Sequence, residues 1–275
     1  MLAPLERLKV AACGLAGAAW SALSAAGRAF LGPERFDRMV DASGLRRLKS
    51  RLWLERIVLA DGTVLLHRPQ DRCIIEEVAG GAYASAPVEP GATVVDVGAH
   101  IGTFALLAAR MVGPSGRVVA LEPSPATLEL LRRNVALNGL SWVKVHPVGA
   151  AEAEGTAELF TASGLDNPAA DTLSPTPGRR GVMVRLARLD DVLAQEGCTR
   201  VDLLKLDVEG AELRALAGAP RTLALTRRIV MEVHPPAAPL QEVRRVLEGA
   251  GFDCRVLTQK PGSAILDAAR VRSCS

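Results

Sequence analysis

"VVDVGAHIGTFALL", residues 94–107, decides the fold of this 275-residue chain. The apolar run of Val94, Val95 and Val97 around a single acid is typical of a strand buried on both faces of a parallel sheet. Two glycines four positions apart follow it, and the next apolar run predicts a helix over 103–112. We therefore expect a strand, a tight turn and a helix, the unit from which sheets with helices on both faces are built.

The same alternation continues along most of the chain. Runs rich in Val, Leu and Ile predict further strands, and the intervening segments carry apolar residues at helical spacing. A helix after Ser124 has Pro125 at its first position and Gly139 just past its end, which are ordinary start and stop signals. The sequence predicts an α/β fold with a doubly wound, mostly parallel, Rossmann-like sheet. The further predicted strands cover 117–121, 142–148, 156–160, 182–187, 201–207, 227–234, 252–257 and 263–267.

An appendage over 1–69 precedes the main domain, which we assign to 70–275. Residues 10–27 carry no charge, a feature that signal peptides and membrane segments share. Ala and Gly dominate there, whereas spanning helices need larger apolar residues. A docked or surface-lying helix is therefore favoured, with membrane contact as the alternative. A β-hairpin is expected around Asp61-Gly62, a dipeptide suited to tight turns.

Composition excludes some partners. The net charge is only +3 and aromatic residues make up 3% of the chain, so few side chains could stack on bases. Nucleic acid is not expected as a partner. Five cysteines occur without a CxxC pair, which favours a reducing, cytoplasmic location. The oligomeric state is not predicted.

The glycine turn indicates which cofactor fits. Ligands of doubly wound sheets bind beyond the carboxyl ends of the strands. A dinucleotide loop needs glycine where this chain has His100, because the backbone must approach a pyrophosphate there. Glu122, at the end of the second strand, can accept both hydroxyls of a ribose. The turn favours an adenosine cofactor without a pyrophosphate, such as S-adenosylmethionine, and the alternative is a nicotinamide-dependent oxidoreductase.

Three segments carry a family resemblance: "VVDVGAHIGTFALLAA…GRVVALEPSPATLELLRRNVALNGL", "VDLLKLDVEGAELRALAGA" and "IVMEVHP". In order and spacing they resemble the FkbM-type S-adenosylmethionine-dependent methyltransferases, with "KLDVEGAE" as the most particular phrase. The resemblance implies a seven-stranded class I methyltransferase sheet with a reversed last strand. It also implies O-methylation of a sugar, polyketide or related small molecule or glycan. By position, the cofactor-binding residues would be Asp96, Gly98, Ala99, His100, Gly102, Glu122 and Pro123.

Candidate catalytic residues follow two later strands. Asp207 ends one predicted strand with Glu209 two residues on, and Glu232 and His234 end the next. Adjacent parallel strands should bring all four to one rim beside the cofactor. We favour a catalytic set of Asp207, Glu209 and His234, in which Asp207 or His234 is the general base. The alternative is a divalent cation bound by these three residues and Glu232. The alternative without function is that these residues only end strands and cap a helix, with Glu212 as a solvated first-turn acid.

Two further residues and one segment complete the prediction. Lys205 lies inside a buried-strand pattern and should either extend its amine to solvent or pair with a neighbouring acid. Tyr83, the only tyrosine, has a family-like position beside the cofactor pocket. The polar loop 161–181 is long enough to be a lid or binding loop. The chain is thus predicted to be an enzyme, with a catalytically silent cofactor-binding module as the non-enzymatic alternative.

Overall fold

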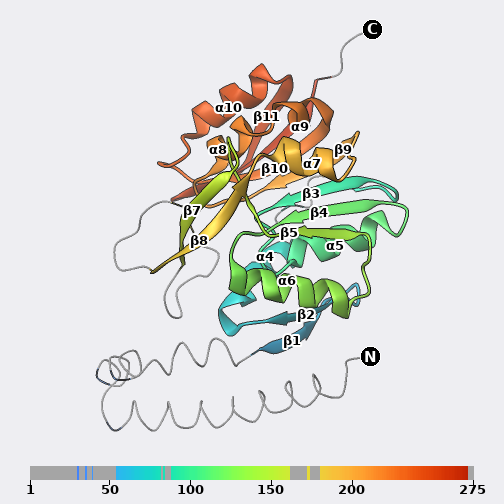
Figure 1. Ribbon diagram of the computed structural model, residues 1–275, viewed down its shortest axis with the longest axis vertical. Helices are drawn as coiled ribbons and strands as arrows, with labels where there is room; N and C mark the ends of the chain where they lie inside the picture. The colour runs from blue at the N-terminus through green and yellow to red at the C-terminus, as the bar shows by residue number, and fades with distance from the viewer. Residues whose placement is uncertain are drawn as a thin grey trace.

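The computed structural model describes residues 54–81, 83, 88–161, 172–173 and 180–271, together with Phe30, Arg35 and Met39 (Figure 1). Residues 10–27, for which a docked or surface-lying helix is expected, lie outside these described residues. Most of the predicted loop 161–181 lies outside them as well. Within the described part of the chain, no helix is both long and apolar enough to cross a membrane.

A seven-stranded sheet forms the centre of the molecule (Figure 1). Its order is β11-β12-β10-β9-β3-β4-β5. Neighbours from β10 to β5 are parallel, whereas β12 runs antiparallel to both β10 and β11. The doubly wound sheet and its reversed last strand are confirmed. The strands are β3 Thr93–Val97, β4 Arg117–Leu121, β5 Val143–His146, β9 Val201–Leu206, β10 Thr226–Val233, β11 Phe252–Lys260 and β12 Ser263–Arg270.

Helices cover both faces of this sheet (Figure 1). Side chains of a strand alternate between its two faces, so Val94 belongs to one buried cluster while Val95 and Val97 belong to the other. The cluster that contains Val94 packs under α4, α5 and α6, and the other packs under α7 to α10. The helices are α4 Arg72–Ala79, α5 Thr103–Val112, α6 Pro125–Leu137, α7 Leu189–Gln195, α8 Glu212–Ala217, α9 Pro220–Leu225 and α10 Leu240–Gly249.

Most predicted elements are found near their expected bounds. The helix over 103–112 and the strand over 117–121 match α5 and β4, and Ser124 is the N-cap of α6. The predicted extended pair is β7 Gly155–Thr161 and β8 Arg180–Ala187, which pair antiparallel. In the part of the chain that the structure describes, four short elements were not predicted: the 3-10 helix η1 Pro69–Asp71, α4, α9 and the two-residue strand β6 Gly149–Ala150, which pairs with β8.

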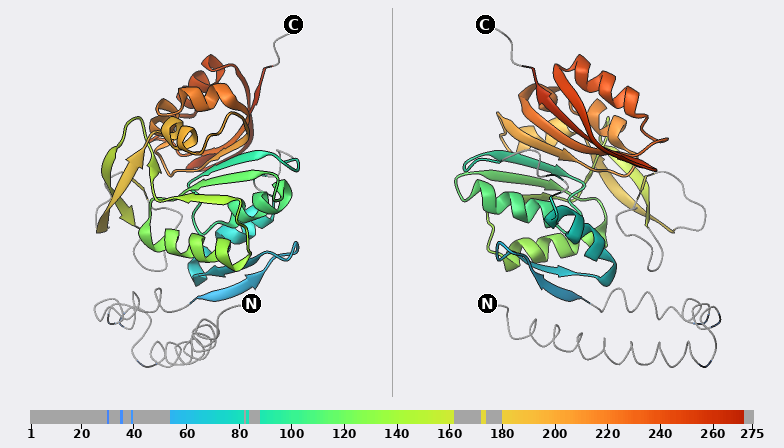
Figure 2. Two further views of the ribbon diagram at one scale, coloured as in Figure 1. Left: turned by 45° about the vertical axis from the view of Figure 1, so that its right-hand side comes forward. Right: turned by 180° about the vertical axis from the view of Figure 1, so that it is seen from behind.

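The predicted hairpin is confirmed and lies against α6 (Figure 2). β1 Glu55–Val58 and β2 Val64–His67 pair antiparallel around a turn in which Gly62 has φ +82°. Asn134 of α6 accepts from the Leu66 amide (2.7 Å) and donates to its carbonyl (3.0 Å). Asn138 makes the same pair of bonds with Val64, at 2.9 and 2.7 Å. The hairpin is therefore bonded to the main domain, and the boundary at residue 69 stays a prediction.

Candidate active site

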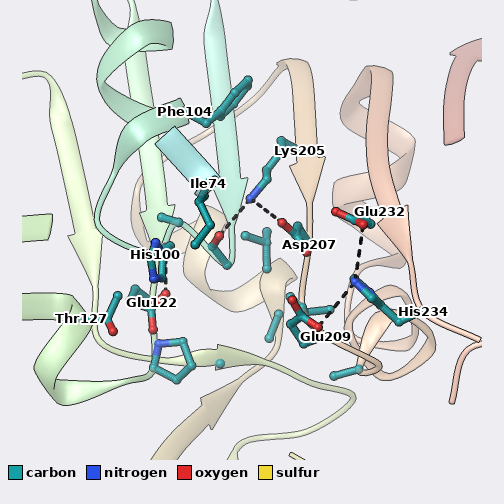
Figure 3. Close-up of a pocket in the computed structure, with 18 of the residues that line it drawn as sticks. Ile74, His100, Phe104, Glu122, Thr127, Lys205, Asp207, Glu209, Glu232 and His234 are labelled. Atoms are coloured by element: carbon teal, nitrogen blue, oxygen red, sulfur yellow. Dashed lines mark hydrogen bonds and ion pairs between the residues drawn. The ribbon is translucent and has the colours of Figure 1, made fainter. Parts of the chain in front are cut away.

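A cavity of about 500 Å³ lies at the carboxyl ends of β3, β4, β9 and β10. Its volume is in the range of small-molecule sites. Figure 3 shows that its polar side chains come from two sides, with His100 and Glu122 on one and Asp207, Glu232 and His234 on the other. Residues from both predicted groups therefore face one cavity, although Asp96 and Gly102 do not line it.

The turn after β3 depends on its two glycines. Gly98 has φ +76° and lines the cavity together with Ala99. A side chain at Gly98 would overlap the carbonyl oxygen of Asp207. Gly102 has φ +93° and begins α5, where a Cβ would lie 2.6 Å from the side chain of Leu131. Gly98 thus sets the approach of the turn to β9, whereas Gly102 packs beneath the cavity.

Asp96 is fully buried and faces Lys205 rather than the cavity. The Lys205 Nζ lies 3.2 Å from Asp96 Oδ1 and 3.6 Å from Asp207 Oδ2, and it donates to the Gly98 carbonyl at 2.9 Å. Burial opposes the charge of Lys205, but the two carboxylates outweigh burial and raise its pKa. The predicted pairing of Lys205 with an acid is confirmed, and it connects the turn to Asp207.

Glu122 is held by the backbone. Its two carboxylate oxygens accept from the amides of His100 (2.9 Å) and Ser124 (2.8 Å), and only 6% of the residue is exposed. Glu122 and the adjacent Pro123 both line the cavity. The predicted ribose acid therefore has a fixed position in the cavity wall.

His100 adopts a left-handed conformation, φ +53°, and its ring lines the cavity. Its Nε2 lies 3.3 Å from Arg68 Nη2 and 3.5 Å from Asp71 Oδ1. Burial lowers the pKa of His100 to about 4, with Asp71 opposing and Arg68 adding to the shift. The imidazole is therefore neutral near pH 7, at the position where a dinucleotide loop has glycine.

The opposite side of the cavity carries the predicted acid cluster. Asp207, Glu232 and His234 each present a potential ligand atom, and these atoms lie within 4.8 Å of one another. Tyr83 donates its hydroxyl to Asp207 Oδ2 at 3.1 Å and lines the cavity, as its expected position implied. Burial, followed by the charges of Asp207 and Glu232, raises the pKa of Tyr83, so this hydroxyl stays protonated. Such a cluster could hold a cation. That these residues act without a metal therefore stays a prediction.

Glu209 also faces this cluster. Its backbone is left-handed, φ +49°, in the turn that follows β9 and precedes the start of α8. Its Oε2 lies 3.5 Å from His234 Nε2 (Figure 3). Burial raises the pKa of Glu209 to about 8; His234 opposes the shift, and Asp207, Glu232 and Glu212 add to it.

The expectation of a solvated Glu212 is wrong. Glu212 is fully buried, and its Oε1 lies 2.7 Å from His234 Nδ1 and accepts from the Gly210 amide at 3.0 Å. The sharp turn through Glu209 and Gly210, both at positive φ, directs the first turn of α8 back under His234. Burial alone would lower the pKa of His234, but the bond from Glu212 and the nearby carboxylates raise it to about 9.

Sequence reasoning missed residues in and behind the cavity wall. Arg68 and Asp71, joined at 2.8 Å, contact the His100 ring from behind the wall, in the segment before α4 that includes the 3-10 helix Pro69–Asp71. Ile74 and Glu77 of α4 line the cavity. Among these residues and Glu212, only Glu212 could have been found from the sequence, because it belongs to the family phrase "KLDVEGAE".

Known proteins are similar to this chain in sequence. The model of the Methyltransferase FkbM domain matches residues 96–254, more than half of the chain. Methyltransferase sdnD of Sordaria araneosa is 35% identical over 202 residues, 62% of this chain and 76% of that protein. The 31-O-demethyl-FK506 methyltransferase FkbM of Streptomyces tacrolimicus is 32% identical over 217 residues, 66% of this chain and 78% of that protein. The 2-O-methyltransferase NoeI of Sinorhizobium fredii (strain NBRC 101917 / NGR234) is 27% identical over 159 residues, 52% of this chain and 64% of that protein.

The sheet order and these matches define the class as a Rossmann-like methyltransferase. More particularly, the chain belongs to the FkbM methyltransferase family. The methyltransferase prediction is thereby confirmed over the nicotinamide-dependent oxidoreductase.

Proposed function

We propose that the protein transfers a methyl group from S-adenosylmethionine to a hydroxyl of a small molecule or glycan. The observation that carries this proposal is a single cavity with the glycine turn and Glu122 on one side and Asp207, Glu209 and His234 on the other. When bound, S-adenosylmethionine supplies an electrophilic methyl group on a positively charged sulfur.

The residues on the first side fit this cofactor. Gly98 leaves no room for a side chain, so the turn approaches the cavity as bare backbone. Glu122 presents a carboxylate that can accept from ribose hydroxyls. The His100 ring is held in the wall by Arg68 and Asp71 and fills space that a pyrophosphate would need.

The second side suits activation of a hydroxyl. Methyl transfer neutralises charge, so positioning contributes most of the rate, and a base assists by accepting the hydroxyl proton. Asp207 and His234 both face the cavity and can act in this way, and Glu209 lies beside His234. In this assignment Asp207, Glu209 and His234 form the catalytic set.

The acceptor class is supported by the relatives' names. One relative is named as a 31-O-demethyl-FK506 methyltransferase and another as a 2-O-methyltransferase. Carboxylates at the acceptor side of the cavity, which include Glu77 and Glu232, accept hydrogen bonds from hydroxyl groups. We accordingly propose a hydroxylated acceptor without negative charge.

Calorimetric titration tests the cofactor assignment. The purified protein is titrated with S-adenosylmethionine and, in parallel, with NADH. The proposal expects micromolar binding of the first and no binding of the second. Folded protein that binds neither ligand would overturn it.

The acceptor is tested in a second assay. Hydroxylated acceptors, including monosaccharides and macrolide alcohols, are screened with a donor carrying a labelled methyl group, with and without EDTA. Labelled product whose formation resists EDTA supports O-methylation without a metal. Loss of transfer with EDTA and recovery with Mg²⁺ would instead favour a cation at Asp207, Glu232 and His234. Transfer only to amines would overturn the hydroxyl assignment.

A further inference from the structure

Glu212 has surroundings unlike those of the three neighbouring acids on its side of the cavity. The side chains of Asp207, Glu209 and Glu232 are 24%, 25% and 18% exposed, whereas the Glu212 side chain is fully buried. Its Oε1 contacts only two donors among the described residues, His234 Nδ1 and the Gly210 amide, and its Oε2 has no hydrogen-bond partner there. A buried carboxylate with so few partners is costly unless it meets a positive charge.

His234 is the group that meets this carboxylate. The 2.7 Å contact between Glu212 Oε1 and His234 Nδ1 has the length of a charge-assisted hydrogen bond. Because a carboxylate only accepts, a proton must lie on Nδ1. The other ring nitrogen, Nε2, then lies toward the cavity, 3.5 Å from Glu209 Oε2 and 3.8 Å from Glu232 Oε1 (Figure 3).

We propose that Glu212 is a positioning residue that fixes the His234 ring, so that Nε2 is the proton acceptor for the acceptor hydroxyl. This inference rests on the proposed function and selects His234 over Asp207 as the base. The acceptor oxygen bonds to the methyl carbon as the carbon–sulfur bond breaks and its electron pair passes to sulfur. The hydroxyl proton goes to Nε2 and later leaves to solvent.

The surroundings of the ring set its proton affinity. Glu209 and Glu212 approach from the segment around the start of α8, Glu232 from β10 and Asp207 from the end of β9. Lys205 lies within 3.6 Å of Asp207 and offsets part of that negative charge. The excess of carboxylates raises the proton affinity of His234, in line with its pKa of about 9. The neutral ring, which alone can accept the hydroxyl proton on Nε2, is therefore the form that grows as pH rises towards this pKa.

A purely structural role for Glu212 is the alternative. Glu212 also accepts from the Gly210 amide and so contributes to the start of α8. Glu212→Gln separates the two roles, because its amide oxygen can still accept from both Gly210 and His234 Nδ1 while the charge is lost. Glu242→Gln is the matched control, since Glu242 is an exposed first-turn acid of α10.

The first experiment needs no acceptor. Nitrogen-15 NMR of the four histidines measures the tautomer and pKa of His234, which is assigned by its absence in His234→Gln. We expect Nδ1 to carry the proton in neutral His234, and its pKa to fall by at least about one unit in Glu212→Gln but not in Glu242→Gln. A neutral ring protonated on Nε2, or an unchanged pKa, would overturn the proposal.

The second experiment measures turnover. In Glu212→Gln the acidic limb of the kcat–pH profile should move to lower pH with the pKa of the base, while S-adenosylmethionine affinity stays within about twofold. His234→Ala should regain activity with added imidazole, a readout that does not require any Glu212 variant to fold. An unchanged limb would overturn the positioning role of Glu212, and no recovery with imidazole would overturn His234 as the base. Wild-type protein without donor binding or transfer would instead overturn the proposed function.

Discussion

The two sides of the cavity hold their acids in different ways. Glu122 is bound by the backbone amides of His100 and Ser124. Asp207 and Glu212, across the cavity, are bound mainly to the side chains of other titratable residues. Backbone amides cannot exchange a proton with a carboxylate, whereas tyrosine, lysine and histidine can. The side with Glu122, which we propose binds the cofactor and call the cofactor side, therefore holds one arrangement of charges. On the side with Asp207 and Glu212, which we propose binds the acceptor and call the acceptor side, the carboxylates contact groups that can themselves carry or release a proton.

The two sides are joined at one point. No side chain fits at Gly98 against the Asp207 carbonyl, and Lys205 contacts Asp96, Asp207 and the Gly98 carbonyl at once. A change at this junction should affect both sides, whereas changes elsewhere should affect only one.

The largest effect is expected at His234. His234→Gln should lower kcat by about 10²–10⁴-fold, the usual contribution of a general base, and leave S-adenosylmethionine affinity unchanged because the cofactor side is intact. Single-turnover kinetics with the labelled donor, together with calorimetry, provide the measurement. Asp207→Asn is the informative comparison. A large loss in Asp207→Asn with activity retained in His234→Gln would make Asp207 the base.

Gly98→Ala should destabilise the contact between the glycine turn and the end of β9. A left-handed backbone costs a non-glycine residue about 1 kcal/mol, and the overlap with the Asp207 carbonyl should bring the total loss of unfolding free energy to about 3 kcal/mol or more. Gly139→Ala is the matched control, because Gly139 has φ +67° and nothing within 4 Å of the added Cβ. Urea denaturation of both variants gives the difference. Equal losses would show that the close approach of the turn to β9 has no energetic importance.

Local patterns identified the sheet and the cofactor turn, because strand, glycine turn and helix are all encoded within 94–112. Glu212 could not be placed in this way. Its position three residues after Glu209 fits a solvated helix start, and only the positive φ values of Glu209 and Gly210 turn it inward. The segment before α4, with Arg68 and the 3-10 helix Pro69–Asp71, was missed for a related reason. Arg68 reaches His100 across 32 positions of the chain, and no spacing rule predicts such a contact.

Glu122→Ala should affect the cofactor side alone. Loss of hydrogen bonds to a charged acceptor should weaken S-adenosylmethionine binding by about 1–3 kcal/mol, with kcat at saturating donor within a few-fold of wild type. Calorimetry measures the first quantity and steady-state kinetics the second. Since Glu122 also binds the amides of His100 and Ser124, thermal denaturation is needed to verify that the turn remains folded. Equal donor affinity in a folded variant would refute the ribose role.

The smallest effect concerns the pH dependence of stability, which should come from the acceptor side. The folded-state pKa values of His234 and Glu209, about 9 and about 8, both lie above the ordinary values of 6.5 and 4.5. The folded protein therefore binds more protons than the unfolded chain over these intervals, and stability must fall as pH rises. Between pH 6.5 and 9 the loss should be on the order of 1–2 kcal/mol, less than the separate shifts imply because the two groups interact.

Urea denaturation at pH 6, 7.5 and 9 measures this loss, and His234→Gln removes the contribution of the histidine. The variant should therefore show a flatter pH dependence than the wild type, while Glu242→Gln should follow the wild type. A wild-type stability that rises across this interval would mean that His234 and Glu209 do not retain their protons in the fold. In that case the charges of the acceptor side would not change with pH over this interval. The acceptor side would then not differ in this respect from Glu122 on the cofactor side, and the contrast between the two sides would be lost.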